Sequence, residues 1–200
     1  MAAQNALATT LRQLHVPGKP LLLTNVYDAV SAKAVAALPG TRALATASYA
    51  VAPAAGVTDD AMTLETNLNA VRSISPVAKE YGLPLSVDWQ DGYGDRLEEG
   101  VEKLLRLGVV GINLEDCDKA TQKMLPINEA AERVKESLPL RKITGSEISS
   151  SMPAPIRSFM EVPFLTQSSE GNHTLLLVRL LCSSGEDLFA AELRRLGLWS

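Results

Sequence analysis

Acidic residues and glycines are concentrated in the segment Ser86–Asp95 (SVDWQDGYGD), at the end of a predicted buried strand. Asp88 stands where that strand ends, so its carboxylate would project from the end of the sheet. Gly92 and Gly94 allow the backbone to turn tightly over a ligand, because glycine adopts conformations that other residues avoid. This combination indicates a loop that binds a polar ligand or a metal ion.

Three carboxylates are candidates for a shared metal site, namely Asp59, Asp88 and Glu115. Carboxylate oxygens suit Mg²⁺, which keeps several waters and takes only one or two carboxylates directly. Without a cation, three carboxylates in one cavity would repel one another. The structural alternative is that Asp91 and Asp95 form an ordinary turn and that Glu115 caps the next helix. The spacing alone leaves both interpretations open.

Polar residues follow each of the four predicted strands in the first part of the chain. They are Asn25, Tyr27 and Asp28, then Ser48 and Tyr49, then Asp88, and finally Glu115 and Asp116. In a parallel α/β sheet, the carboxyl ends of the strands and the loops after them form the ligand-binding face. Four successive polar ends favour a functional site over the alternative that the core simply stops there.

The elements that would position these residues alternate along the chain. The predicted strands are Pro20–Thr24, Arg42–Ser48, Leu83–Asp88 and Val109–Leu114. The predicted helices are Ala29–Leu38, Thr63 to about Tyr81, Leu97–Leu107 and Asn128–Leu138. Strands and helices in this order predict an α/β fold with parallel strands and right-handed crossovers.

The first sixteen residues predict a short amphipathic helix, with Leu7, Leu11 and Leu14 at helical spacing and Pro17 after it. They lack the basic region and the dense apolar run of a secretory signal, so we expect a cytoplasmic protein. A mitochondrial transit peptide is the alternative, because no acidic residue precedes Asp28.

Composition excludes several classes of function. The chain of 200 residues has 19 basic and 23 acidic residues and a net charge of -4, which argues against a nucleic-acid partner. No apolar run approaches the roughly 18 to 20 residues of a membrane span. Two cysteines are too few for a disulfide scaffold or a zinc cluster.

Residues 139–200 have a different character from the 138 residues before them. Ten serines lie in residues 141–200, against six in the preceding 140. Residues 146–155 (SEISSSMPAP) are typical of a loop or linker, and we expect this serine-rich tail to be partly disordered. Residues 174–182 and 188–198 are apolar enough to be ordered. We therefore divide the chain into a region 1–138 and a divergent tail 139–200.

Five segments resemble the isocitrate lyase and phosphoenolpyruvate mutase superfamily, in the order and spacing of that family. They are Asn25–Ala32, Ala45–Ala50, Gly56–Asp59, Asp88–Gly94 and Gly111–Asp116. The resemblance covers roughly residues 10–138. It implies a (β/α)8 barrel that makes or breaks C–C or P–C bonds in small α-oxo or hydroxy acids, through Mg²⁺-stabilised enolates.

The resemblance also implies roles for individual residues. Asp88 matches the direct metal ligand, and Asp59 and Glu115 match carboxylates that hold metal-bound water. Ser48 and Tyr49, with their backbone amides, resemble the loop that grips the substrate carboxylate. Tyr27 resembles a tyrosine that lines the substrate pocket. Asp88 would also contact the substrate through the metal site.

Three features depart from the family pattern. Gln90 stands where many members have a second aspartate. The loop from Cys117 to Pro126 lacks the lyase motif with its catalytic cysteine, so Cys117 is interpreted as an idle thiol. Residues 139–200 resemble none of the later barrel units, so the sequence predicts about four βα units of a barrel followed by a non-matching tail.

Two functional hypotheses follow. The first is a Mg²⁺-dependent lyase-like or mutase-like enzyme acting on a small α-oxo or hydroxy acid. The second is a truncated, catalytically silent remnant, such as a mis-spliced gene would produce, that acts as an association partner. Four parallel strands would leave two unpaired edges, which invite a homo-oligomer or a covering by the tail.

Overall fold

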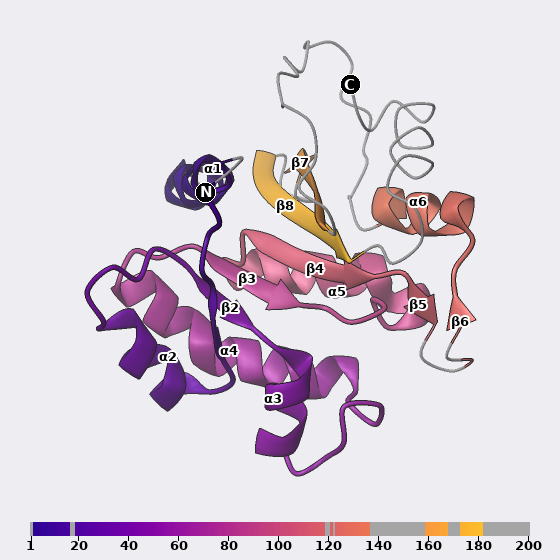
Figure 1. Cartoon of the computed structure of the whole chain (residues 1–200), viewed down its shortest axis with the longest axis horizontal. Coiled ribbons are helices and arrows are strands. Elements are labelled where there is room, and N and C mark those ends of the chain that lie inside the picture. Colours follow the sequence, from indigo (N-terminus) through magenta and orange to yellow (C-terminus); the bar gives the residue numbers. More distant parts are fainter. Residues whose placement is uncertain are drawn as a thin grey trace.

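The computed structural model describes residues 2–16, 19–118, 121, 123–136, 159–167 and 173–181. A six-stranded sheet lies at the centre of the described fold, in the order β1-β2-β3-β4-β8-β7 (Figure 1). The strands are β1 (Thr24–Val26), β2 (Leu44–Thr46), β3 (Leu85–Asp88), β4 (Gly111–Glu115), β7 (Phe159–Gln167) and β8 (His173–Leu181). The five strands β1, β2, β3, β4 and β8 pair in parallel in this order, and β7 pairs antiparallel with β8.

Helices follow the strands as the alternating pattern predicts. They are α1 (Ala2–Leu14), α2 (Ala29–Ala36), α3 (Ser48–Ala54), α4 (Leu64–Glu80), α5 (Leu97–Arg106) and α6 (Ile127–Glu136). A 3₁₀ turn, η1 (Gly94–Arg96), precedes α5, and a small hairpin joins β5 (Cys117–Asp118) to β6 (Lys123–Met124). The predicted α/β class with parallel strands is confirmed. Among the described helices, none is long and apolar enough to cross a bilayer.

Capping side chains fix where two of the helices begin. Asp28 Oδ1 accepts a hydrogen bond from the Ser31 amide at 2.7 Å, and Ser31 Oγ accepts one from the Asp28 amide at 3.1 Å. The Ser31 backbone amide also lowers the pKa of the Asp28 carboxyl. Thr63 caps α4 in the same way, accepting from the Thr66 amide at 3.2 Å. Such caps satisfy backbone donors of the first turn and so set the residue at which each helix begins.

Two elements differ from the sequence predictions. The first strand was expected at Pro20–Thr24 but begins only at Thr24, because Leu21 and Leu23 pack against α1 instead of joining the ladder. The segment around Ser48 was expected as a loop and is the short helix α3. Pro53 and the lack of a capping side chain hide this helix from the sequence pattern.

The main core lies between the sheet and the helices α2, α4 and α5, which lie along one side of the sheet in Figure 1. The strands contribute Val26, Leu44, Leu85, Val87, Ile112 and Leu114, and α4 and α5 contribute Leu68, Val71, Ile74, Val101 and Leu104. Because side chains alternate along a strand, the residues between these apolar positions face the opposite side.

The opposite side of the sheet is covered near its amino end by α1. Leu11 is 2% exposed and belongs to a second core cluster with Ala8, Leu14, Ala43 and Val110. A Cβ at Gly111 would lie 2.9 Å from Leu11 Cδ2, so α1 packs closely against this strand position. The predicted N-terminal amphipathic helix is therefore confirmed and closes the amino end of the sheet.

The tail contributes two strands to the sheet. Residues 173–181 form β8, which pairs in parallel with β4, with Gly111 opposite Leu177. The edge of β4 that the sequence left unpaired is thus occupied, as one of the open alternatives proposed. The expected linker at residues 146–155 and the helical pattern at 188–198 lie outside the described residues.

Candidate functional site

Small and polar residues line the sheet face opposite the helix-packed core. The positions that alternate with core residues are Ala45, Ser86, Asp88, Gly111 and Asn113. Asp88 ends β3, and Glu115 ends β4 in the same alternation. This face of the sheet is therefore polar, with two carboxylates at its carboxyl end.

Backbone amides hold the Asp88 side chain. Asp88 Oδ2 accepts a hydrogen bond from the Ser48 amide at 2.8 Å, and Oδ1 accepts one from the Gln90 amide at 3.3 Å. The Asp88 amide donates to Thr46 Oγ1 at 2.9 Å, which ties the end of β3 to β2. Amide donors therefore hold both oxygens of the Asp88 side chain in place at the strand end.

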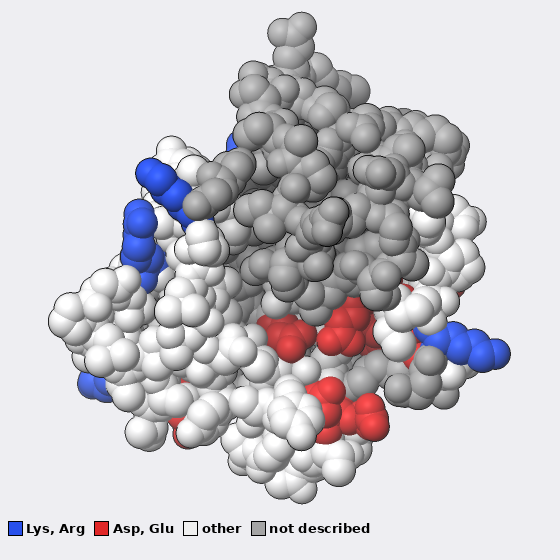
Figure 2. All heavy atoms as spheres, in the orientation of Figure 1, with Lys and Arg blue, Asp and Glu red and all other residues white. Residues whose placement is uncertain are grey.

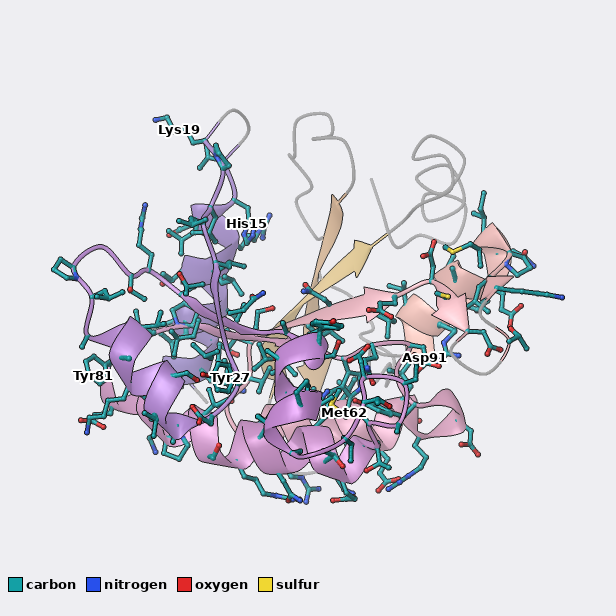
Figure 3. All side chains as sticks on the ribbon, turned by 60° about the horizontal axis from the view of Figure 1, so that its bottom comes forward. His15, Lys19, Tyr27, Met62, Tyr81 and Asp91 are labelled. Carbon is teal, nitrogen blue, oxygen red and sulfur yellow. The ribbon has the colours of Figure 1, made fainter. Side chains whose placement is uncertain are left out.

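The residues predicted to contact the substrate have different environments. Ser48 is buried and its amide binds Asp88, instead of remaining free for a substrate carboxylate as the sequence suggested. Tyr49 is 80% exposed in α3, and Tyr27 is 43% exposed after β1. Tyr27 lies well apart from Asp91 in Figure 3. The structure brings Ser48 to the Asp88 carboxylate, and the substrate contacts of Tyr27 and Tyr49 stay predictions.

The loop after β3 has an unusual backbone. Gln90 and Tyr93 have φ of 49° and 61°, in the left-handed region that side chains other than glycine rarely adopt. Gly92 has φ of 83°, and a Cβ there would lie 2.6 Å from Leu97 Cδ1. The sequence prediction of a glycine-dependent turn is correct, and Asp91 Oδ1 accepts from the Tyr93 amide at 3.0 Å as a turn-former would.

Arg133 of α6 binds the backbone of the loop after β3. Its Nη2 donates to the carbonyl oxygens of Asp91 and, at 3.3 Å, of Gly94. The guanidinium therefore binds backbone carbonyls of the loop through two hydrogen bonds. The fourth predicted helix thus serves to position the loop of the third strand.

Asn67 is a site residue that the sequence analysis missed. Its side chain is fully buried in α4, and its Nδ2 donates to the Asp88 carbonyl at 2.9 Å and to the Tyr93 hydroxyl at 2.8 Å. The signal was present in the sequence, because Asn67 interrupts the apolar stripe of Leu64, Leu68 and Val71. A polar residue on the buried face of a helix usually has a hydrogen-bonding role.

The pKa of the Tyr93 hydroxyl is affected by burial and by nearby carboxylates. Burial raises the pKa of its hydroxyl, and the charges of Asp88, Asp91 and Asp59 raise it further. Its ring packs edge to face against Trp89 with centroids 5.0 Å apart. Tyr93 is consequently a neutral phenol at physiological pH, close to three acidic side chains.

The other two predicted metal residues contact Gln90. Gln90 Nε2 donates to Asp59 Oδ1 at 2.9 Å and to the Asp59 carbonyl at 3.2 Å. The Glu115 amide donates to the Gln90 carbonyl at 2.8 Å. Asp59 and Glu115 are thereby attached to the same loop as Asp88.

Cys117 has the environment of an unreactive thiol. Burial raises the pKa of its thiol, and the charges of Glu115, Asp116, Asp118 and Asp91 raise it further. Since the thiolate is the reactive form, this environment opposes nucleophilic or acid–base use at neutral pH. The structural surroundings therefore support the interpretation of Cys117 as idle.

Acidic side chains dominate the face where β3 and β4 end. Figure 2 shows them grouped in the middle of this face, with lysine and arginine side chains toward its periphery. Among the described residues, no three His, Cys, Asp or Glu side chains form a complete metal-ligand group. Mg²⁺ needs only one or two direct carboxylates and keeps several waters, so the oxygen donors at this end of the sheet are of the kind that suits Mg²⁺.

His15 lies away from the loop after β3. His15 and Lys19 lie far from Asp91 in Figure 3, and His15 Nδ1 is 2.8 Å from the Leu11 carbonyl oxygen. The candidate site is therefore built from carboxylates, amides and a phenol, without a contribution from His15.

Solved structures of other proteins share the fold of this chain. A candidate phosphonomutase from Burkholderia cenocepacia J2315 is 36% identical with a TM-score of 0.62, over 67% of this chain and 53% of that one. Oxaloacetate acetylhydrolase in complex with its product oxalate is 27% identical with a TM-score of 0.57, over 66% and 47%. The described βα units thus form part of a TIM-barrel-like fold, and the predicted fold is confirmed.

Sequence comparison gives the same relationship. An uncharacterized protein of Mycobacterium tuberculosis is 29% identical over 126 residues, which are 62% of this chain and 46% of that protein. The chain spans about half the length of the relatives that it matches. Residues 11–147 match the phosphoenolpyruvate phosphomutase family, with the matched segment including Asp59, Asp88 and Glu115. The chain therefore belongs to the phosphoenolpyruvate phosphomutase family of the phosphoenolpyruvate mutase and isocitrate lyase superfamily.

Proposed function

We propose that this protein is a Mg²⁺-dependent enzyme that makes or breaks a C–C or P–C bond in a small α-oxo or hydroxy acid through an enolate. The observation that carries this proposal is the fixed Asp88 carboxylate, bound by the Ser48 and Gln90 amides at the end of β3. Membership of the family supports the reaction class.

Asp88 is the residue that would hold Mg²⁺ directly, and Asp59 and Glu115 would act through water. A bound Mg²⁺ would supply positive charge to substrate oxygens on which negative charge develops. Both Asp88 oxygens already accept amide hydrogen bonds, so the carboxylate needs little reorganisation when a cation arrives. Preorganisation of this kind is what an enzyme requires at a site of developing charge.

The other residues of the site hold and shield this carboxylate. Asn67 fixes the Asp88 carbonyl and the Tyr93 hydroxyl from the buried side of α4. Because the pKa of Tyr93 is raised, its hydroxyl keeps its proton and is available as a hydrogen-bond donor beside the carboxylates. Tyr27 and Tyr49 remain the proposed substrate contacts, and their exposed side chains leave them accessible to a ligand.

The substrate class is proposed from two relatives. One similar structure is oxaloacetate acetylhydrolase with its product oxalate, and another is 2,3-dimethylmalate lyase, whose 20% identity shows a shared fold. Both names describe compounds with two carboxylates. We therefore choose oxalate as a probe, since its two adjacent oxygens resemble those of an α-oxo acid or its enolate.

The test is calorimetric titration of the folded chain with Mg²⁺ and oxalate, comparing the wild type with Asp88→Asn. We expect saturable oxalate binding that requires Mg²⁺, weakened more than about tenfold in Asp88→Asn, because loss even of indirect metal partners has that effect. Circular dichroism checks that the variant is folded.

Asp95→Asn is the matched control, because Asp95 is an exposed carboxylate of the same loop. It should bind as the wild type does. Equal binding by Asp88→Asn and the wild type would refute the metal assignment.

The same titration addresses the alternative role of a catalytically silent association partner. That role is supported by β1, whose outer edge has no partner strand in the described sheet. A folded chain that binds neither Mg²⁺ nor oxalate, and that forms a stable dimer in solution, would favour association over catalysis.

A further inference from the structure

We propose that Gln90 is a positioning residue: its side chain fixes Asp59 for a divalent cation, from a segment whose backbone also binds Asp88 Oδ1 and the Glu115 amide. This inference deepens the proposed function and rests on it. The sequence marks Gln90 only as the place where a second aspartate is missing. The structure instead gives this glutamine contacts with all three predicted metal residues.

Gln90 uses three different groups for these contacts. Its side-chain Nε2 donates to Asp59 Oδ1 at 2.9 Å and to the Asp59 carbonyl at 3.2 Å. Its backbone amide donates to Asp88 Oδ1 at 3.3 Å, and its carbonyl accepts from the Glu115 amide at 2.8 Å. The three partners come from the α3–α4 loop, from β3 and from β4, so Gln90 joins three separate segments at one point.

A neutral amide suits this position better than a carboxylate. Asp59 presents a carboxylate oxygen and a carbonyl oxygen to residue 90, and the carbonyl also accepts a hydrogen bond from the Met62 amide at 3.1 Å. The two hydrogens of Nε2 bind both oxygens, whereas a carboxylate there would face two oxygens at hydrogen-bond distance. This donor requirement also fixes the amide orientation, because the reverse orientation would place oxygen against oxygen.

The placement of Gln90 is energetically unfavourable in two respects. Its side chain is 0% exposed, and its Oε1 is buried without a hydrogen-bond partner among the described residues. Its φ of 49° lies in the left-handed region. Unpartnered buried atoms and strained backbone concentrate at functional sites, where the surrounding structure enforces them.

The first experiment is a double-mutant cycle without metal, using Gln90→Met, Asp59→Ala and the double variant in the full chain. Methionine keeps the length of glutamine and fills the buried space, while it removes the donors. If Gln90 holds Asp59, the double variant loses less in melting temperature than the two single losses combined. Additive losses would overturn the proposal, whatever the protein does with Mg²⁺.

The second experiment is a Mg²⁺ titration of Gln90→Met followed by calorimetry. We expect binding at least about tenfold weaker than in the wild type, as for other residues that orient ligands. Gln4→Met is the matched control, because Gln4 Nε2 also donates two hydrogen bonds, here to the carbonyl oxygens of Leu105 and Val109, at 2.9 and 3.1 Å. It should lose melting temperature but bind Mg²⁺ as the wild type does.

The outcomes separate this inference from the proposed function. A coupled cycle with weakened Mg²⁺ binding confirms the positioning role, and a coupled cycle with unchanged Mg²⁺ binding refutes it. A wild-type chain that binds no Mg²⁺ refutes the proposed function and the cation role of Gln90 with it. In that case the cycle still decides whether Gln90 holds Asp59.

Discussion

Asn67 shows how one buried side chain connects the core to the site. It donates one hydrogen to the Asp88 carbonyl and the other to the Tyr93 hydroxyl, from a helix position that is fully buried. Its Oδ1 has no hydrogen-bond partner among the described residues. The end of β3 and the loop after it are therefore joined by a single amide group inside the apolar core.

We expect Asn67→Leu to lower the free energy of unfolding by about 1–3 kcal/mol, because two buried acceptors lose their donor. Asn69→Leu is the matched control, since Asn69 lies two residues further along the same helix and is exposed. Urea denaturation monitored by circular dichroism measures both. Equal losses in the two variants would show that the Asn67 hydrogen bonds contribute nothing to stability.

At the residue scale, the sequence predicted the position of the Asp88 carboxylate better than it predicted the residues that hold it. Asp88 could be placed because a carboxylate directly followed a clear apolar strand. Asn67 and Gln90 could not, because their partners lie on other segments and local spacing does not encode such contacts. Ser48 was expected to bind substrate through its amide, but folding directs that amide to Asp88.

Helices α4 and α5 are joined on their exposed sides by charged residues. Glu99 pairs with Arg96 at 3.0 Å and with Lys103 at 2.6 Å, and both cations also pair with Glu65 of α4. Hydrogen bonds from Arg96 and Lys103 lower the pKa of Glu99 from 4.5 to about 2. Because these side chains are about half exposed, the pairs add little stability each.

The lowered pKa gives a pH dependence with a definite sign. The stabilisation by ionised Glu99 is present above the ordinary pKa of 4.5 and is lost as the pH falls toward about 2. Glu99→Gln should therefore have a slightly lower melting temperature than the wild type at neutral pH. This difference in melting temperature should vanish as the pH approaches about 2. Thermal melts across this range measure it, and a difference that grows on acidification would contradict the assignment.

At the element scale, apolar periodicity located the strands and most helices, because burial on one face imposes a period on the sequence. It failed for α3, which is short and contains Pro53. It also gives no reason for Gly100 inside α5, where a glycine weakens a helix. The reason is tertiary, since a Cβ there would lie 2.6 Å from the Trp89 ring.

The whole molecule depends on α1 to close the amino end of the sheet. We expect Leu11→Ala to destabilise the protein by about 2–5 kcal/mol, because its side chain is fully enclosed and its removal leaves a cavity beside Gly111. Leu22→Ala, at a position 88% exposed, should change stability by less than about 0.5 kcal/mol. Chemical denaturation of both variants tests whether α1 is integral to the fold.

At this scale, the sequence predicted four parallel βα units but not the neighbour of β4. Residues 174–182 were expected to be ordered, and residues 174–181 of this segment lie in β8. Their pairing with β4 could not be read from the chain, because a strand's periodicity shows that it pairs but not with which strand.

The strand order has a consequence for synthesis on the ribosome. Strands β2, β3 and β4 each pair with the strand made just before, so this part of the sheet is able to assemble as the chain emerges. The edge of β4 has to wait until β8 has been translated. During that interval the nascent chain presents an open strand edge, which makes it a target for chaperones and for pairing with a neighbouring nascent chain.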